Sequence, residues 1–190
     1  MADPSDLFRD VASNMARVAE SPYVETVRRA TDLLLERFRA GNKLLVFGNG
    51  GSSADAQHLT AELVGRFTKE RRPLPAIALT TNQALLTAWS NDYAFEDVFA
   101  RQIEAIGRPG DVAWGISTSG TSANVVNGLR RAREQGLRTI GLTGESGGKL
   151  TELCDVLLAV PLTSTARIQE IHLVTYHAIC ASVEDQLFSD

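Results

Sequence analysis

Several features that define other classes of protein are scarce or absent in this sequence. Only two cysteines occur among 190 residues, Cys154 and Cys180, and they form neither a disulfide framework nor a CxxC motif. Both thiols are therefore expected to be reduced and buried, as in a cytoplasmic protein. No apolar run approaches the ~20 residues of a membrane-spanning helix, and the acidic N-terminus has no apolar core like that of a signal peptide. The sequence therefore predicts a cytoplasmic protein without membrane partners.

Basic clusters and nucleotide-binding motifs are also missing. The net charge is −4, and the densest basic stretch, residues 69–72, is short and interrupted by an acid. Nucleic acid is therefore not an expected partner. The glycines that follow residue 47 match neither GxGxxG nor a Walker loop, because no GK[ST] follows them. This absence lowers support for dinucleotides and nucleoside triphosphates as ligands.

Two segments of similar design stand out among the residues that are present. Residues 44–53 and 112–122 each consist of an apolar strand, a loop of small polar residues and the start of a helix-like stretch. The first turn of a helix has free N–H groups and a partial positive charge, and glycine lets a ligand approach the backbone closely. A phosphate-bearing ligand fits both loops.

The two loops differ in how strongly they indicate a ligand. The first, residues 48–51, is equally compatible with an ordinary tight connection between strand and helix. The second places five hydroxyls in six positions, although capping a helix needs only one. These hydroxyls belong to Ser117, Thr118, Ser119, Thr121 and Ser122. The surplus favours a phosphate site built from neutral donors.

Strand and helix patterns alternate along the chain and predict an α/β three-layer sandwich with a central parallel sheet. The expected strands are residues 43–47, 76–79, 111–116, 138–142 and 156–160. The expected helices are residues 5–20, 22–40, 53–67, 82–90, 95–106, 122–135 and 165–188, with a turn at 91–93 and a loop at 143–148. Residues 1–190 read as one domain, with helices to about 40, a sheet-and-loop core over 43–160 and a C-terminal helix. Ligands of such sheets bind where the strands end, which is where both Gly/Ser loops lie.

The final predicted helix, residues 165–188, carries apolar residues around nearly its whole circumference. Such a helix at the end of a small domain favours a subunit interface, so the terminal helices are expected to form the core of an oligomer. The alternative is a central core helix within one subunit.

A few side chains in these helices are suited to chemistry. Asp55, His58 and Glu62 share a helix face, as an acid/base pair or as metal ligands. In the alternative reading Glu62 pairs with Arg66 and His58 lines the core. A second group, Gln169, His172 and His177, lies on the final helix. His58, Glu62, Gln169 and His177 would suit zinc, although Gln169 and His177 are ~12 Å apart along a straight helix.

The order and spacing of several motifs resemble the phosphoheptose isomerases, which have the sugar isomerase (SIS) fold, from about residue 40 to the C-terminus. The motifs are Gly48-Asn49-Gly50-Gly51-Ser52, Asp55-Ala56-Gln57-His58, Ala61-Glu62-Leu63, Gly115-Ile116-Ser117-Thr118-Ser119-Gly120, Ser122-Ala123-Asn124, Leu142-Thr143-Gly144, Gly147-Gly148 and Arg167-Ile168-Gln169-Glu170 with His172. The phosphate loop is shared across the SIS class, whereas the combination of His58 and Glu62 with Gln169 and His177 is much narrower.

The resemblance implies an aldose–ketose isomerase that converts sedoheptulose 7-phosphate to D-glycero-D-manno-heptose 7-phosphate, in a homotetramer with sites between subunits. It implies Glu62 and His177 as the acid/base pair, and one zinc ion held by His58, Glu62, Gln169 and His177. The substrate-binding residues it implies are Asn49, Gly50, Gly51, Ser52, Glu62, Asn91, Asp92, Ser117, Thr118, Ser119, Ser122 and Gln169. The alternatives are a non-catalytic SIS protein that associates with a replication initiator, and a SIS isomerase for another sugar phosphate. The presence of both Glu62 and His177 favours the enzyme.

Overall fold

A computed structural model describes residues 3–189, so Met1, Ala2 and Asp190 of the predicted domain lie outside the described residues. Five parallel strands form one sheet in the order β2-β1-β3-β4-β5. The strands are β1 (Leu44–Gly48), β2 (Ala76–Ala78), β3 (Val112–Ile116), β4 (Arg138–Gly144) and β5 (Val156–Val160). The helices are α1 (Pro4–Ala19), α2 (Tyr23–Arg39), α3 (Gly51–Val64), α4 (Gln83–Asp92), α5 (Val98–Ile106), α6 (Ala123–Glu134) and α7 (Thr165–Leu187), with short 3₁₀ turns η1 (Phe95–Asp97) and η2 (Gly148–Glu152).

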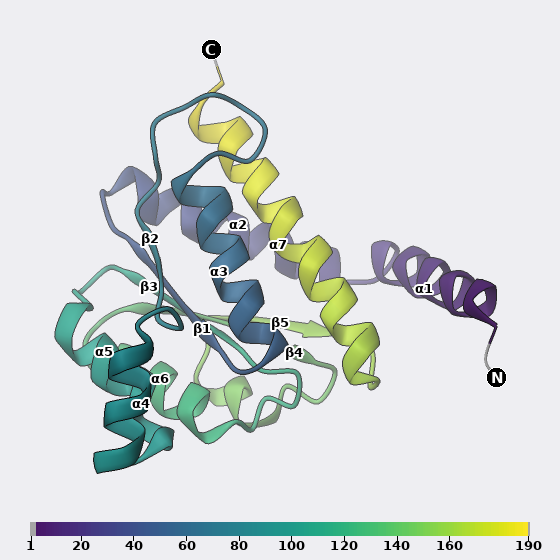
Figure 1. Cartoon of the computed structure of the whole chain (residues 1–190). Coiled ribbons are helices and arrows are strands. Elements are labelled where there is room, and N and C mark those ends of the chain that lie inside the picture. The colour runs from purple at the N-terminus through teal and green to yellow at the C-terminus, as the bar shows by residue number, and fades with distance from the viewer. Residues whose placement is uncertain (1–2, 190) are drawn as a thin grey trace.

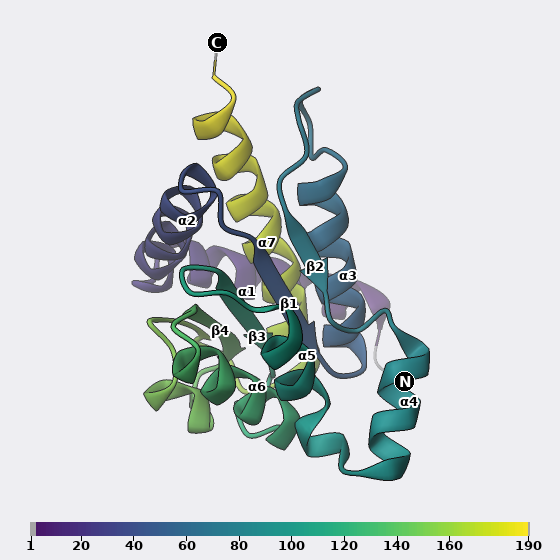
Figure 2. The ribbon, with the colours of Figure 1, turned by 90° about the vertical axis from the view of Figure 1, so that its left-hand side faces the viewer.

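Helices cover both faces of the sheet, which confirms the predicted three-layer α/β architecture (Figures 1 and 2). Alternate strand side chains pack on opposite sides, because successive residues of a strand point to opposite faces. Val46 and Trp114 belong to the core beneath α2, α3 and α7, whereas Leu45 and Phe47 belong to the core beneath α5 and α6. All five residues of β1 and of β3 are buried, as expected for central parallel strands.

The register of the sheet brings the two Gly/Ser loops together. Gly48 at the end of β1 lies beside Ile116 at the end of β3, so the two loops leave neighbouring strands at the same edge. A Cβ on Gly48 would come within 2.9 Å of the Ile116 carbonyl oxygen, so this close crossing requires glycine. The predicted placement of both loops at the carboxyl edge is confirmed.

Several boundaries differ from the sequence prediction. The helix predicted at residues 53–67 runs instead from Gly51 to Val64, and the first residues of the helix predicted at 95–106 form the 3₁₀ turn η1. Two further elements extend beyond their predicted ends. The turn predicted at 91–93 is wrong at its first two positions, because α4 continues through Asp92 and only its C-cap residue, Tyr93, lies outside the helix. The loop predicted from residue 143 begins later, because Thr143 and Gly144 pair with Ala159 and Val160 of β5 as the end of β4. In each case backbone pairing continues past the point where polar or small side chains suggested a break.

Helices α3 and α7 lie side by side and run in the same direction across one face of the sheet (Figure 1). The contacts between them advance in step along both helices, from Gly51 with Gln169, through His58 with His177, to the end of each helix. Helix α1 extends away from the rest of the molecule, to the right in Figure 1. Within residues 3–189, no helix has both the length and the apolar character needed to cross a lipid bilayer.

Candidate active site

The first Gly-rich loop connects β1 to α3 and leaves its backbone open. Gly50 has φ of +55°, a conformation that side-chain-bearing residues rarely adopt, and α3 begins at the next residue. A Cβ on Gly51 would lie 2.7 Å from Nε2 of Gln169, so the amide of that α7 residue lies directly over the helix start. Ser52 is buried and its N–H donates to the carbonyl oxygen of Asn49 at 2.9 Å. The helix start thus faces a polar amide from α7.

The second loop gathers its hydroxyls into one connected set. The Ser117 hydroxyl lies 3.0 Å from that of Ser122, and the Ser119 hydroxyl lies 2.9 Å from that of Thr121. Ser122 is the N-cap residue of α6, yet its side chain makes no capping hydrogen bond. Its hydroxyl is therefore not used to cap the helix and contacts the Ser117 hydroxyl instead, in agreement with the predicted surplus of donors.

A third loop holds the second one in shape. Gly120 has φ of +66°, and a Cβ there would lie 2.2 Å from the carbonyl oxygen of Gly147. The N–H of Lys149 donates to the carbonyl oxygen of Gly120 at 2.9 Å. A cleft of about 280 Å³ opens beside this junction, lined by Thr118, Ser119, Gly144, Glu145, Ser146, Leu162, Thr163, Thr165 and Ile168. The cleft lies between the hydroxyl-rich loop and the start of α7.

The side chains of Asn49 and Asn124 join the first two loops, a link that the sequence patterns did not reveal. Each amide nitrogen donates to the other residue's amide oxygen at 2.8 Å, and Asn124 is only 2% exposed. The sequence signal was weak, because an asparagine in the first turn of a helix is ordinary and its partner is 75 residues away.

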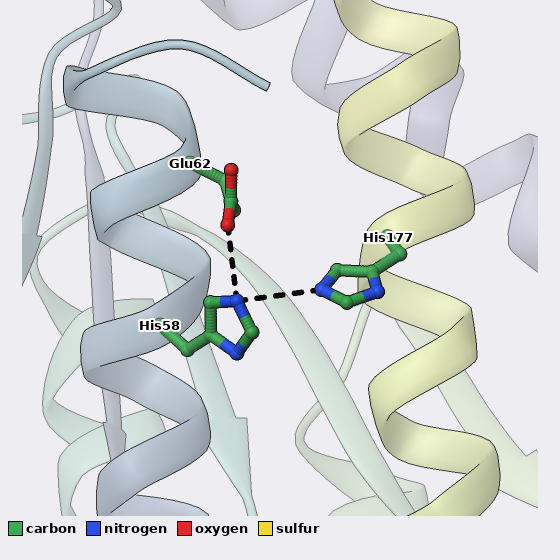
Figure 3. Close-up of side chains that lie close together, drawn as sticks. All are labelled: His58, Glu62 and His177. Atoms are coloured by element: carbon green, nitrogen blue, oxygen red, sulfur yellow. Dashed lines mark hydrogen bonds and ion pairs between the residues drawn. The ribbon is translucent and has the colours of Figure 1, made fainter. Parts of the chain in front are cut away.

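Three side chains from α3 and α7 converge beyond the loops (Figure 3). Nε2 of His58 lies 3.0 Å from Oε1 of Glu62 and 3.5 Å from Nε2 of His177. One ligand-type atom from each of the three lies within 4.8 Å of the others. The predicted convergence of His58, Glu62 and His177 is therefore present in a single chain.

The structure rules out the alternative interpretation of the sequence, in which Glu62 pairs with Arg66 and His58 lines the core. Glu62 does not pair with Arg66, which instead forms an ion pair with Glu70 at 3.0 Å. His58 does not line the core either, because 43% of its side chain is exposed. Both residues face α7 (Figure 3).

Aromatic and acidic neighbours surround the three side chains. The hydroxyl of Tyr176 lies 3.1 Å from Nδ1 of His58 and donates to Oδ1 of Asp55 at 3.4 Å. The ring of Phe67 lies 5.5 Å from the ring of His177. Burial raises the pKa of Asp55 and, together with the nearby carboxylate, that of Tyr176. Burial and the neighbouring His58 lower the pKa of His177, which favours its neutral ring.

The remaining predicted residues lie elsewhere in the chain. Asn91 and Asp92 occupy the last turn of α4, hydrogen-bonded to each other at 2.8 Å, and α4 packs on η1 and α5 rather than beside α7 (Figures 1 and 2). The side chain of Gln169 lies beside Gly51. Gly51 precedes His58 by seven residues, which is a rise of ~10 Å along α3. His172, the third histidine, is fully buried; its Nε2 lies 3.3 Å from the Thr143 carbonyl oxygen, and burial lowers its pKa to about 4.

The convergent donors of α3 and α7 fit a divalent cation. Two imidazole nitrogens and one carboxylate oxygen form a set typical of zinc and similar ions. Nε2 of His58 lies close both to the Glu62 carboxylate and to Nε2 of His177, so a single cation between them could accept a lone pair from each of the three groups. The arrangement of His58, Glu62 and His177 is therefore a candidate metal site.

Comparison with known proteins decides the family. The SIS domain family profile matches residues 7–144. A phosphoheptose isomerase from Crocosphaera subtropica is 58% identical over 167 residues, which cover 88% of this chain and 85% of that protein. Another from Roseiflexus sp. is 57% identical over 197 residues, with full coverage of both chains. The chain belongs to the phosphoheptose isomerase family.

Solved structures of phosphoheptose isomerases have the same fold along nearly the whole chain. The structure from Neisseria gonorrhoeae has a TM-score of 0.90 at 42% identity, covering 95% of this chain and 96% of that one. The structure from Francisella tularensis has a TM-score of 0.90 at 36% identity, with the same coverage of both chains. The fold and family implied by the sequence motifs are thereby confirmed, and the chain is an isomerase.

Proposed function

We propose that this isomerase interconverts D-sedoheptulose 7-phosphate and D-glycero-D-manno-heptose 7-phosphate. The observation that carries the proposal is the convergence of Glu62 and His177 on facing helices, in a chain that is 58% identical to a phosphoheptose isomerase. A non-catalytic scaffold or a regulatory SIS protein has no need of such a pair. A SIS isomerase for another sugar phosphate is distinguished by its substrate preference.

The phosphate is proposed to bind the hydroxyl-rich loop, through Ser117, Thr118, Ser119 and Ser122. Four neutral hydroxyls and the N-terminus of α6 can surround an anion without a nearby lysine or arginine. The sugar is proposed to contact Asn49, Gly50, Gly51, Ser52, Glu62, Asn91, Asp92 and Gln169. The open backbone at Gly50 and Gly51, with Gln169 above it, supports this part of the assignment.

The reaction moves a hydrogen between carbons 1 and 2 of the open-chain sugar through an enediol. In our assignment the Glu62 carboxylate takes a proton from carbon 1 and delivers it to carbon 2. His177 gives a proton to the oxygen on carbon 2 and accepts one from the oxygen on carbon 1, so the protons balance. The lowered pKa of His177 favours the neutral ring, the form that can accept the proton from the oxygen on carbon 1.

Zinc is the proposed cofactor, held by His58, Glu62, Gln169 and His177. The first, second and fourth of these already present ligand atoms within 4.8 Å of one another. When bound, the ion supplies Lewis-acid stabilisation of the negative charge on the enediolate oxygens. Gln169 would have to join the set from its position over Gly51, or from a neighbouring subunit.

A homotetramer with shared sites is part of the same proposal. An apolar groove of about 200 Å³ lies between α1, α2 and α7, lined by residues that include Met15, Val27 and Val174. Leu173 and Val174 on α7 are 39% and 49% exposed, and α1 carries Phe8 at 75% exposure. These apolar surfaces support contact with further copies of the chain. Residues 1–190 are proposed to act as one SIS domain, and the two free thiols support a cytoplasmic location.

The direct test is incubation of the full-length protein with sedoheptulose 7-phosphate, followed by NMR detection of the aldose phosphate. We expect the heptose product with this substrate and far slower turnover with hexose and pentose ketose phosphates. A faster reaction with one of those shorter substrates would contradict the proposed sugar, and the absence of any aldose product would contradict the proposed function.

A further inference from the structure

The hydroxyl of Tyr176 stands between two groups of α3 that are one turn apart. On one side it lies 3.1 Å from Nδ1 of His58, and on the other it donates to Oδ1 of Asp55 at 3.4 Å. The tyrosine ring is fully buried and meets the His58 ring edge-on, with the ring centroids 5.5 Å apart. Tyr176 therefore contacts the side of the His58 ring that carries Nδ1, whereas Glu62 contacts Nε2 on the other side.

The direction of this chain of hydrogen bonds follows from counting protons. A tyrosine hydroxyl has a single proton, and an ionised carboxylate can only accept. Because the Tyr176 proton is directed to Asp55, the tyrosine oxygen remains an acceptor, and Nδ1 of His58 must be its donor. A neutral imidazole with its proton on Nδ1 has a free lone pair on Nε2. That atom is the one facing Glu62 and His177.

We propose that Tyr176, backed by Asp55, is a positioning residue that holds the proton of His58 on Nδ1, so that Nε2 offers its lone pair to a divalent cation shared with Glu62 and His177. This proposal rests on the metal site of the proposed function. Histidine ligands of metals usually donate their second ring N–H to a fixed acceptor, and loss of that acceptor typically weakens metal binding 10- to 100-fold.

The arrangement explains why a tyrosine occupies this position of α7. Tyr176 precedes His177 directly, so the helix that supplies one nitrogen of the metal set also orients a second nitrogen contributed by α3. Phenylalanine would fill the same space and keep the edge-on contact with the His58 ring, but it lacks the hydroxyl that hydrogen-bonds His58 and Asp55. The hydroxyl, rather than the bulk of the ring, is what the proposal requires.

The chain contains a matched control for removal of this hydroxyl. Tyr23 of α2 is also buried, and its hydroxyl lies 2.8 Å from the hydroxyl of Thr175, the residue before Tyr176. Tyr23→Phe therefore removes a buried tyrosine hydrogen bond to the same turn of α7. It leaves His58 and Asp55 untouched.

The experiment measures zinc affinity of the full-length protein by chelator competition for the wild type, Tyr176→Phe and Tyr23→Phe. We expect Tyr176→Phe to raise the zinc Kd 10- to 100-fold and Tyr23→Phe to change it less than about twofold. Both variants should lose thermal stability by similar amounts, which separates affinity from folding. Because the chain has only three histidines, ¹⁵N NMR of the zinc-loaded protein should resolve His58. We expect a protected Nδ1–H in the wild type and faster solvent exchange of that proton in Tyr176→Phe.

Three outcomes would overturn the proposal. The first is a Tyr176→Phe Kd within twofold of wild type, and the second is an equal loss of affinity in both variants. The third is a wild-type protein that binds no zinc, since Tyr176 would then have no cation to serve. None of them decides the proposed isomerisation, which stands or falls on product formation from sedoheptulose 7-phosphate.

Discussion

Asn49 and Asn124 hold the two Gly/Ser loops together through a reciprocal pair of amide hydrogen bonds, each 2.8 Å long. Asn49 follows β1 and Asn124 lies in the first turn of α6, so the pair bridges neighbouring strand ends. The buried position of Asn124 keeps water from competing for the bonds.

We predict that Asn124→Ala lowers the free energy of unfolding by about 2 kcal/mol, because it leaves the Asn49 amide without its partner. The loosened loops should raise KM for the sugar phosphate more than they lower kcat. Chemical denaturation and steady-state kinetics measure the two effects. Asn127→Ala, at an exposed amide of the same helix that bonds Asp97 and the Glu96 carbonyl, serves as the control. An unchanged KM in Asn124→Ala would contradict a role for the pair in shaping the site.

Glu62→Gln is predicted to keep the fold but lower kcat by roughly 10²- to 10⁴-fold, since an amide cannot accept the carbon-bound proton. Glu70→Gln makes the same chemical change at the exposed partner of Arg66, away from His58 and His177, and should be neutral. Initial rates with sedoheptulose 7-phosphate, together with circular dichroism, provide the comparison. Turnover at the wild-type rate would remove Glu62 from the mechanism.

Gly120→Ala is predicted to destabilise the protein by about 3 kcal/mol or more, because the new Cβ would lie 2.2 Å from a backbone oxygen. Gly41→Ala isolates the conformational part of this cost. Gly41 also has positive φ, +80°, but no atom lies within 4 Å of the position that its new methyl group would take, so a loss of only ~1–2 kcal/mol is expected. Thermal and denaturant unfolding measure both. Equal losses would mean that contact with Gly147 does not constrain the hydroxyl-rich loop.

Glu184 is predicted to make stability fall in acid. Its side chain is only 1% exposed; burial alone would raise its pKa, but N–H donors from Phe67, Thr68 and Lys69 lower the pKa from 4.5 to about 2. A carboxyl with a lower pKa in the folded state stabilises the fold above pH 4.5, and this contribution disappears as the pH falls toward 2. The loss amounts to roughly 3 kcal/mol.

The measurement is the free energy of unfolding between pH 2 and 6 for the wild type and Glu184→Gln. The variant should be less stable at neutral pH and should lose less stability on acidification. Glu134→Gln, at an exposed pair with Arg131, should retain the wild-type slope. Parallel curves for the wild type and Glu184→Gln would show that the carboxylate does not carry the acid sensitivity.

We predict that Val174→Glu dissociates the proposed homotetramer into smaller species, because it places a charge on the exposed apolar surface of α7. Light scattering coupled to size-exclusion chromatography measures the mass. Arg130→Glu, which adds an acid on α6 across the sheet, should leave the mass unchanged. A Val174→Glu protein with the wild-type mass would exclude this surface from the interface.

The sequence predicted those parts of the structure that local patterns encode. The apolar runs predicted every strand of the sheet, and the four-residue spacing of His58 and Glu62 placed them on one helix face. Tyr176 has no such signal, because in the sequence it is one more large side chain on a helix that is apolar nearly all round. Its partner His58 lies 118 residues away, and no local pattern reports such a contact. The end of α4 was misjudged for a related reason, since polar residues such as Asn91 and Asp92 occur both in turns and in last helical turns.

The parallel course of α3 and α7 has a consequence for how this scaffold can change. At one end of the two helices Gln169 lies close to Gly51, and at the other Glu184 accepts hydrogen bonds from the segment after α3. His58, Glu62 and His177 lie in the interval between these two contacts. Substitutions there can exchange one chemistry for another, or abolish it, while the two helices keep their mutual alignment.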